Sequence, residues 1–292
     1  MLVALDHVVI AVRDLDAAAE SYARLLGRAS SWRGVHPGAG TANALFRLEN
    51  SYLELLAPAG PGALAAALEA RLAGAGEGLF ALAFGTRDAE ACRAALAARG
   101  LEPGPVASGV GRDVESGAWR EWRNVVLPPA RTRGVPLFAI EHRSPPELLP
   151  LVAPLGAPAA APHALDHVVV RSADADASRA LYGDGLGLRL ALDRRFEAFG
   201  FRGLFFRVGG VTVEVAGPLA AAPDPAAADV LSGLAFSVGD VEAAQRRLAA
   251  LEFDVSPVRT GRKPGTSVCT VRDAPCGVPT LLVGPATSGA AA

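Results

Sequence analysis

The chain has 292 residues, of which 51% are hydrophobic and 20% charged, and its formal net charge at pH 7 is −2. This composition is too apolar for a disordered chain and suffices for two packed domains. The weakly negative net charge gives no sign of the basic surface with which proteins bind phosphates. We therefore expect no nucleic-acid partner.

The first predicted element is an apolar strand at the N-terminus, MLVALDHVVIAV. It is brief, polar residues interrupt it, and no basic segment precedes it, so it does not predict a signal peptide. No segment of the chain reaches the uninterrupted apolar length of a membrane helix. Cys92, Cys269 and Cys276 form no CxxC motif and no even framework, although Cys269 and Cys276 could pair. We therefore expect a cytoplasmic protein with no membrane partner.

The chain contains an internal duplication. Residues 4–14 read ALDHVVIAVRD and residues 164–174 read ALDHVVVRSAD, while SYLELLAP at 51–58 corresponds to VTVEVAGP at 211–218. The spacing from His7 to Glu54 equals the spacing from His167 to Glu214. Residues 144–163 are rich in Pro and Ala and indicate a linker. We expect one domain over residues 1–143 and a second over 164–292.

Each half divides again into two units. The first strand is followed by a helix pattern that begins at Asp14 or Asp16 and stops at Gly27. Residues 79–100 and 231–251 repeat this strand and helix, with an Asp that can cap each helix. Short β-rich runs follow every helix, which predicts four units of one strand, one helix and about three strands. Residues 62–77 predict an additional amphipathic helix between the first two units.

These motifs resemble those of a known superfamily. The strand L-D-H-V-V-I, the helix D-L-D-A-A-A-x-x-Y and the strand Y-L-E-L are similar to modules of the vicinal oxygen chelate group, which contains glyoxalases, bleomycin-resistance proteins and extradiol dioxygenases. The run HPGAGTAN at 36–43 resembles a glyoxalase-like subgroup. The resemblance implies an α+β fold of four βαβββ modules in two glyoxalase-like halves. Each half would curl its mixed sheets into a cup that holds a divalent metal.

The resemblance also implies metal ligands on the first and last strands of each module. In the first module these places hold His7 and Glu54, and aligning the second module puts Ala81 and Glu141 there. We expect His7, Glu54 and Glu141 to bind Zn, Mn, Fe, Co or Ni and to leave one position open. Ala81 departs from a four-ligand pattern, so loss of the metal is an open alternative.

The second half offers fewer ligands. Its third module supplies His167 and Glu214, but the fourth has Gly233 and Leu281 at the partner places. We expect no metal in this half and a residual hydrogen bond between the His and the Glu.

Further candidates lie in the loop and strand around the expected cup. His36 in its Gly-rich loop is a candidate general base, and Thr41 and Asn43 could orient a polar substrate. The same residues could simply close a turn. In the strand 119–124, Trp119, Glu121 and Arg123 share one face and Arg120, Trp122 and Asn124 share the other. From this run we select Trp122 and Arg123 as candidates for substrate binding, against the blander reading of a half-exposed strand.

Two functions follow from these residues. The first is a metal-dependent enzyme of lyase or isomerase type that acts on a small oxygenated molecule, with the ion stabilising a developing enolate. The alternative is a metal-free small-molecule binding or resistance protein that uses the cup as a pocket. The sequence leaves a homodimer open.

Overall fold

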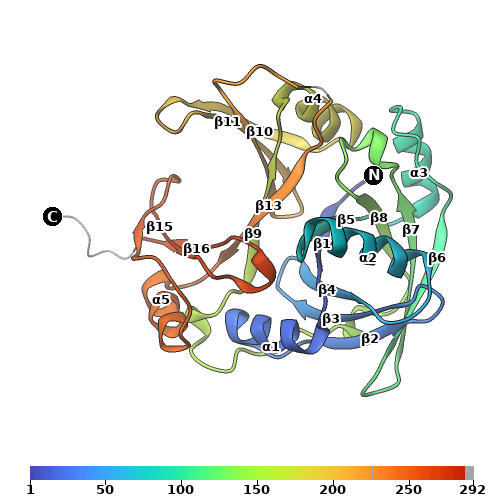
Figure 1. Cartoon of the computed structure of the whole chain (residues 1–292), viewed down its shortest axis with the longest axis horizontal. Helices are drawn as coiled ribbons and strands as arrows, with labels where there is room; N and C mark the ends of the chain where they lie inside the picture. The colour runs from blue at the N-terminus through green and yellow to red at the C-terminus, as the bar shows by residue number, and fades with distance from the viewer. Residues whose placement is uncertain (225, 287–292) are drawn as a thin grey trace.

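Two eight-stranded sheets make up the structure, a computed structural model that describes residues 1–224 and 226–286. The first eight strands form a closed barrel in the order β1-β4-β3-β2-β6-β7-β8-β5, and the other eight form an open sheet in the order β10-β11-β12-β9-β13-β16-β15-β14. The two sheets lie next to each other (Figure 1). The α+β fold of two similar halves is therefore confirmed. Residues 287–292 of the expected second domain lie outside the described residues.

Both halves repeat the expected unit of strand, helix and three strands. The first half contains β1 (Ala4–Ala11), α1 (Leu15–Leu26), β2 (Trp32–His36), β3 (Thr41–Arg47), β4 (Tyr52–Pro58), α2 (Ala63–Ala75), β5 (Gly78–Gly85), α3 (Ala89–Ala97), β6 (Ala107–Asp113), β7 (Trp119–Val126) and β8 (Leu137–His142). The second half contains β9 (Ala164–Arg171), α4 (Ala175–Arg179), β10 (Arg189–Phe196), β11 (Phe201–Val208), β12 (Val211–Pro218), β13 (Val230–Ser237), α5 (Val241–Ala250), β14 (Arg259–Thr260), β15 (Thr266–Val271) and β16 (Thr280–Pro285). Within residues 1–224 and 226–286, no helix has the length and apolar character to cross a membrane.

An aspartate caps the first helix of every module. Asp14 accepts hydrogen bonds from the backbone N–H groups of Asp16 and Ala17, both at 3.0 Å. Asp88, Asp174 and Asp240 cap α3, α4 and α5 in the same way. Gly27 ends α1 with a φ of 63°, a left-handed conformation that glycine adopts at little cost. These caps fix the point at which each strand turns back as a helix.

The strand register shows that the modules are equivalent. His7 lies beside Tyr52 and Val9 beside Glu54 in the parallel β1–β4 pair, and the β9–β12 pair has the same register. The first strand of every module also has a β-bulge. It lies at the residue directly before the position where the sequence analysis looked for a metal ligand: Asp6, Phe80, Asp166 and Ser232. A bulge places two residues opposite one on the neighbouring strand and redirects their side chains.

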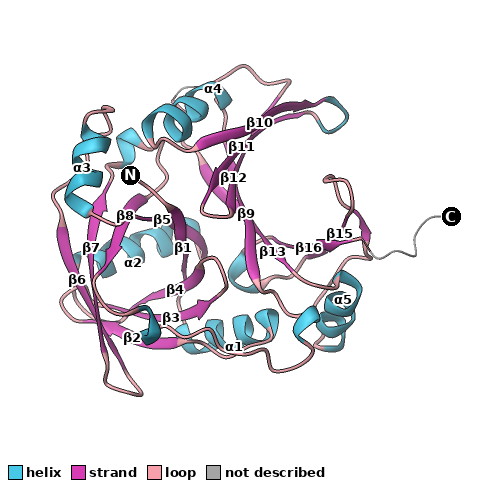
Figure 2. Cartoon of the chain, turned by 180° about the vertical axis from the view of Figure 1, so that it is seen from behind, coloured by secondary structure: helices cyan, strands magenta, loops and turns pink. Residues whose placement is uncertain are grey.

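Strand alternation divides the barrel into an inner and an outer face. Val8, Ile10, Leu53 and Leu55 point outward into a core that is continuous with that of the second half. The intervening residues of the same strands point inward. Helix α2 covers one end of the barrel, in front of it in Figure 1 and behind it in Figure 2, and Leu68 and Leu72 pack on inward-facing residues.

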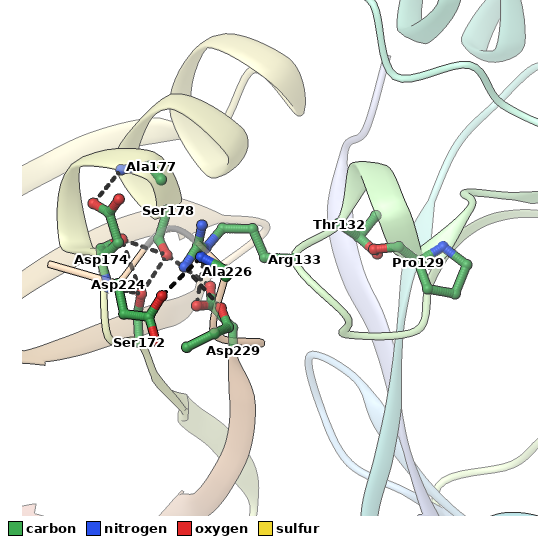
Figure 3. A network of polar contacts seen from close by, with 11 residues as sticks. Pro129, Thr132, Arg133, Ser172, Asp174, Ala177, Ser178, Asp224, Ala226 and Asp229 are labelled. Carbon is green, nitrogen blue, oxygen red and sulfur yellow. Dashed lines mark hydrogen bonds and ion pairs between the residues drawn. The ribbon is translucent and has the colours of Figure 1, made fainter.

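A buried polar network joins the two halves (Figure 3). Arg133, in the segment before β8, reaches across to Asp229, with 3.0 Å between its Nε atom and the Oδ1 atom of the carboxylate. The other carboxylate oxygen accepts from the Ser178 hydroxyl at 2.6 Å, and the backbone N–H of Asp229 donates to the carbonyl of Arg133. Because these contacts connect the barrel to the open sheet, Arg133, Ser178 and Asp229 help to hold the two halves in their relative position.

Candidate functional site

The barrel encloses a cavity of about 400 Å³. This volume lies toward the lower end of the range of roughly 300–1,000 Å³ that is typical of small-molecule sites. Most of the lining is apolar or aromatic: Val9, Trp32, Pro37, Ala39, Leu45, Tyr52, Leu56, Leu64, Phe80, Ala81, Val110, Trp122, Phe138 and Ile140. The polar lining gathers around His7, His36, Asn43 and Glu54.

An ion-pair chain lies at the centre of the polar lining. His7 is 2% exposed, and its Nε2 atom lies 3.2 Å from Oε2 of Glu54. Its Nδ1 atom lies 2.7 Å from Oδ1 of Asp6, which the bulge in β1 turns toward the imidazole. The Asp6 carboxylate also contacts Nε2 of His142 at 3.0 Å. His7 is therefore held between two carboxylates.

A second imidazole lies on the same wall and has only neutral hydrogen-bond partners. The Nδ1 atom of His36 is 2.8 Å from the hydroxyl of Thr41, and its Nε2 atom is 3.1 Å from Nδ2 of Asn43. The same Asn43 amide donates to Oε1 of Glu54 at 2.8 Å. Since Nδ2 is a donor, Nε2 of His36 carries a lone pair and Nδ1 carries the proton. Thr41 and Asn43, predicted to orient a substrate, thus orient His36.

These surroundings separate the pKa values of the two histidines. Burial alone would lower the pKa of His7, but hydrogen bonds to Asp6 and Glu54 raise it to about 9. Burial lowers the pKa of His36, and the positive charges of Arg120 and His7 add to this effect while Glu54 opposes it. Burial would raise the pKa of Glu54, yet its contacts with His7 bring it down to about 2. At neutral pH His7 is therefore an imidazolium, His36 a neutral imidazole and Glu54 a carboxylate.

Glycines make room for the aromatic wall. A Cβ atom at Gly109 would lie 2.2 Å from Nε1 of Trp122, and one at Gly34 would lie 2.2 Å from Nε1 of Trp32. The two indoles therefore lie flat over glycine backbone, on strands β6 and β2. The predicted position of Trp122 in a pocket wall agrees with this arrangement.

Two predicted site residues lie elsewhere. Glu141 points to the outer face of the barrel, where its carboxylate accepts from the backbone N–H of Ala89 at 2.9 Å and from Arg143 at 2.6 Å. Arg123 is the cross-strand partner of Glu141, and its charge helps to lower the pKa of that carboxyl. Neither residue lines the cavity. The structure thus corrects the expectation that Glu141 meets His7 and Glu54.

The strand register explains the error over Glu141. Val9 lies beside Glu54, and the equivalent pair in the second module is Ala83 beside Phe138. Phe138, not Glu141, occupies the place of Glu54. The expectation from the sequence was therefore three residues off, because the register of β8 is set by its pairing with β5.

The donor set does not fit the metal that the resemblance implies. His7 and Glu54 are the only donors at the four ligand places of the barrel, since Ala81 and Phe138 hold the other two. Within residues 1–224 and 226–286, no group of three or more His, Cys, Asp or Glu residues could hold an ion. The donor atoms of His7 and Glu54 also face each other, so each already has a partner.

The second half repeats this pair more loosely. Nε2 of His167 lies 3.6 Å from Oε2 of Glu214, and Nδ1 of His167 lies 2.7 Å from Asp166. The register places Gly233 and Leu281 at the partner positions, as the sequence alignment predicted. The sheet around them stays open.

Asp6, which contacts His7, and Arg120, which lines the cavity, were not selected from the sequence. Asp6 was missed because the sequence of one repeat does not reveal the bulge that turns Asp6 toward His7. The Asp-His pair occurs in both repeats, and this recurrence could have indicated that the Asp contacts the His. Arg120 lies on the face of β7 that contains Trp122, and strand alternation alone could have found it.

Comparisons with known proteins agree with this architecture. The family described as "Glyoxalase-like domain" matches residues 5–186, which is more than half of the chain. The chain belongs to this glyoxalase-like family. Residues 164–279 match the glyoxalase/bleomycin resistance protein/dioxygenase superfamily, so both halves of the glyoxalase-like protein carry the relationship. No curated protein matches the sequence.

Solved structures resemble the glyoxalase-like chain in fold. A mutant of 4-hydroxymandelate synthase from Streptomyces coelicolor is 18% identical, with 100% of this chain and 94% of that chain covered and a TM-score of 0.69. A hypothetical protein from Staphylococcus aureus is 10% identical, with 95% and 97% covered and a TM-score of 0.65. At these identities the likeness concerns the fold alone. Methylmalonyl-CoA epimerase from Mycobacterium tuberculosis is 26% identical over 45% of this chain and 93% of its own, with a TM-score of 0.37, from which we infer nothing.

Proposed function

We propose that the barrel cavity is the active site of a proton-transfer enzyme, of isomerase or lyase type, that acts on a small oxygenated molecule. The observation that carries the proposal is the pair of imidazoles in one cavity, one held between two carboxylates and the other hydrogen-bonded only to neutral groups. Two titratable groups in opposite protonation states form the usual arrangement of an acid and a base in one site.

The roles follow from the protonation states. Nε2 of His36, whose lone pair accepts from Asn43, would exchange that contact for a proton from a carbon next to a carbonyl group. The electron pair of that C–H bond forms the C=C bond of an enolate while the π pair of the carbonyl moves onto its oxygen, and the imidazolium of His7 lies in the same cavity to stabilise the negative charge. The protonated His36 then returns its proton to another position of the substrate, so atoms and charge balance.

The lining supports an oxygen-bearing ligand. The side-chain oxygens of Asn43 and Asn124 are buried and have no donor among the described residues. A buried acceptor without a donor costs about 1–3 kcal/mol, which a hydroxyl group of a ligand would remove. The metal-dependent form of this function needs ligands beyond His7 and Glu54, so the proposal assigns no step to an ion.

Hydrogen–deuterium exchange tests the function directly. Small 2-oxo acids and 2-hydroxy ketones are incubated with the protein in D₂O, and loss of their C–H signals is followed by NMR. We expect catalysed exchange with some of these compounds, and His36→Ala should slow it by about a hundredfold or more. His163→Ala is the matched control, because this histidine contacts Glu49 outside the cavity.

A metal-free binding protein is the second candidate. The favouring observation is that His7, Glu54, Asn43 and His36 bond to one another, which leaves few free polar atoms for chemistry. If no compound exchanges faster with the protein than without it, but compounds still bind in the barrel, this second function replaces the first.

A further inference from the structure

Arg120 is a charged residue of the cavity with no partner in the ion-pair chain. It lies on β7, is 8% exposed and lines the cavity. Its guanidinium lies over two aromatic rings, 5.4 Å from the centroid of Trp32 and 5.9 Å from that of Tyr52. Cation–π contacts of this kind hold the flat guanidinium in place but use none of its N–H groups.

The N–H donors of this guanidinium are unused. Arg120 has five such donors, and none of them meets an acceptor in the part of the chain that the structure describes. Every other buried charge around the cavity is paired: Asp6 with His7 and His142, and Glu54 with His7 and Asn43. The guanidinium nitrogens of Arg120 are not among the enclosed side-chain atoms without a partner, so they open onto the cavity, where a ligand can reach them.

The site is built rather than accidental. Trp32 lies flat because Gly34 leaves room for it, and Arg120 lies on the ring so positioned. Arg120 is also close enough to His36 for its charge to lower the pKa of that imidazole. A molecule bound to Arg120 would therefore lie within reach of the proposed base.

We infer that Arg120 binds the carboxylate of the substrate, which is a small carboxylic acid with an apolar or aromatic body. A guanidinium presents parallel N–H groups that match the two oxygens of a carboxylate. The body of the molecule would contact the wall that contains Trp122, Phe80 and Phe138. The inference rests on the proposed function for the reacting end of the substrate, but the binding of the carboxylate can be measured alone.

Calorimetric titration with two matched probes tests the inference. Phenylacetate and phenylacetamide have the same shape and differ in charge. We expect the wild type to bind phenylacetate about tenfold or more tightly than the amide, since hydrogen bonds to a charged group contribute more. Arg120→Met should remove most of this preference, and Arg120→Lys should restore only part of it because lysine lacks the paired donors.

Arg123→Met is the control, because Arg123 lies on the same strand but outside the cavity. It should bind phenylacetate like the wild type. The inference is overturned if the wild type binds the amide as tightly as the carboxylate, if it binds neither, or if folded Arg120→Met keeps the preference. If Arg120→Met fails to fold, Arg120→Lys takes its place, and an undiminished preference of that variant for phenylacetate overturns the inference.

The His36→Ala variant separates this inference from the proposed function. If His36→Ala and the wild type both prefer phenylacetate but neither catalyses exchange, the proton-transfer function fails and the carboxylate site stands. If exchange is catalysed and Arg120→Met leaves both exchange and binding unchanged, the carboxylate site fails and the proton-transfer function stands.

Discussion

His7 and Glu54 come from different strands, and Nε2 of one lies 3.2 Å from Oε2 of the other inside the barrel. Their strands β1 and β4 are parallel neighbours, and the register places Glu54 beside Val9, two residues from His7 on the same face. The same register recurs at His167 and Glu214, where the distance is 3.6 Å. The closed barrel surrounds the pair of His7 and Glu54 with a cavity of about 400 Å³.

The protonation of His7 predicts how stability depends on pH. Its pKa is about 9 in the folded chain and about 6.5 when unperturbed. A raised pKa stabilises the fold fully below pH 6.5, and this contribution is lost as the pH rises through 9. We expect the free energy of unfolding to fall by about 3 kcal/mol between these pH values. Urea titrations of the wild type and His7→Gln measure it, and an equal fall in both proteins would refute the assignment.

Gly109 offers a test of the aromatic wall. A methyl group there would meet the indole of Trp122 at 2.2 Å, so Gly109→Ala should displace the ring. We expect altered tryptophan fluorescence and weaker binding of aromatic probes. Gly104→Ala is the control, since a Cβ atom at Gly104 meets only the carbonyl of Val126 at 3.5 Å. Identical fluorescence of wild type and Gly109→Ala would contradict the geometry.

Much of the fold could be predicted from the sequence because its signals are local. An Asp before each helix, a Gly after the first one and the alternating strands defined the modules without any long-range information. Side-chain placement needed more. The register of β8 is set by its pairing with β5, and only that pairing reveals Phe138 at the place given to Glu141.

The network between the halves predicts a large effect on stability. Asp229→Ala would leave the guanidinium of Arg133, which is largely buried, without its carboxylate. Breaking one side of a buried ion pair costs about 3–5 kcal/mol. We expect a lower midpoint of thermal unfolding for Asp229→Ala than for Asp184→Ala, an exposed residue of the same half. A double variant, Arg133→Met with Asp229→Leu, should recover part of the loss, and equal midpoints for the two single variants would show that the network is dispensable.

The donor set of the barrel predicts the response to metal ions. Two donors that already bond to each other compete poorly for an ion, because Ala81 and Phe138 supply none. Prolonged dialysis against a chelator should leave the binding of phenylacetate unchanged. Calorimetric titration with Zn²⁺, Mn²⁺, Co²⁺ and Ni²⁺ should give the same weak signal for the wild type and His7→Ala. A stoichiometric ion that His7→Ala loses would restore the metal-dependent function.

The pH titration of the imidazole signals of His7 and His36 by NMR tests the central claim most directly, with each signal assigned by its loss in the alanine variant. The structure predicts that His7 remains protonated at pH 8 and titrates near 9. It also predicts that His36 takes up its proton only below the ordinary value of 6.5. Two histidines that titrate together near 6.5 would contradict the acid and base assigned to the cavity.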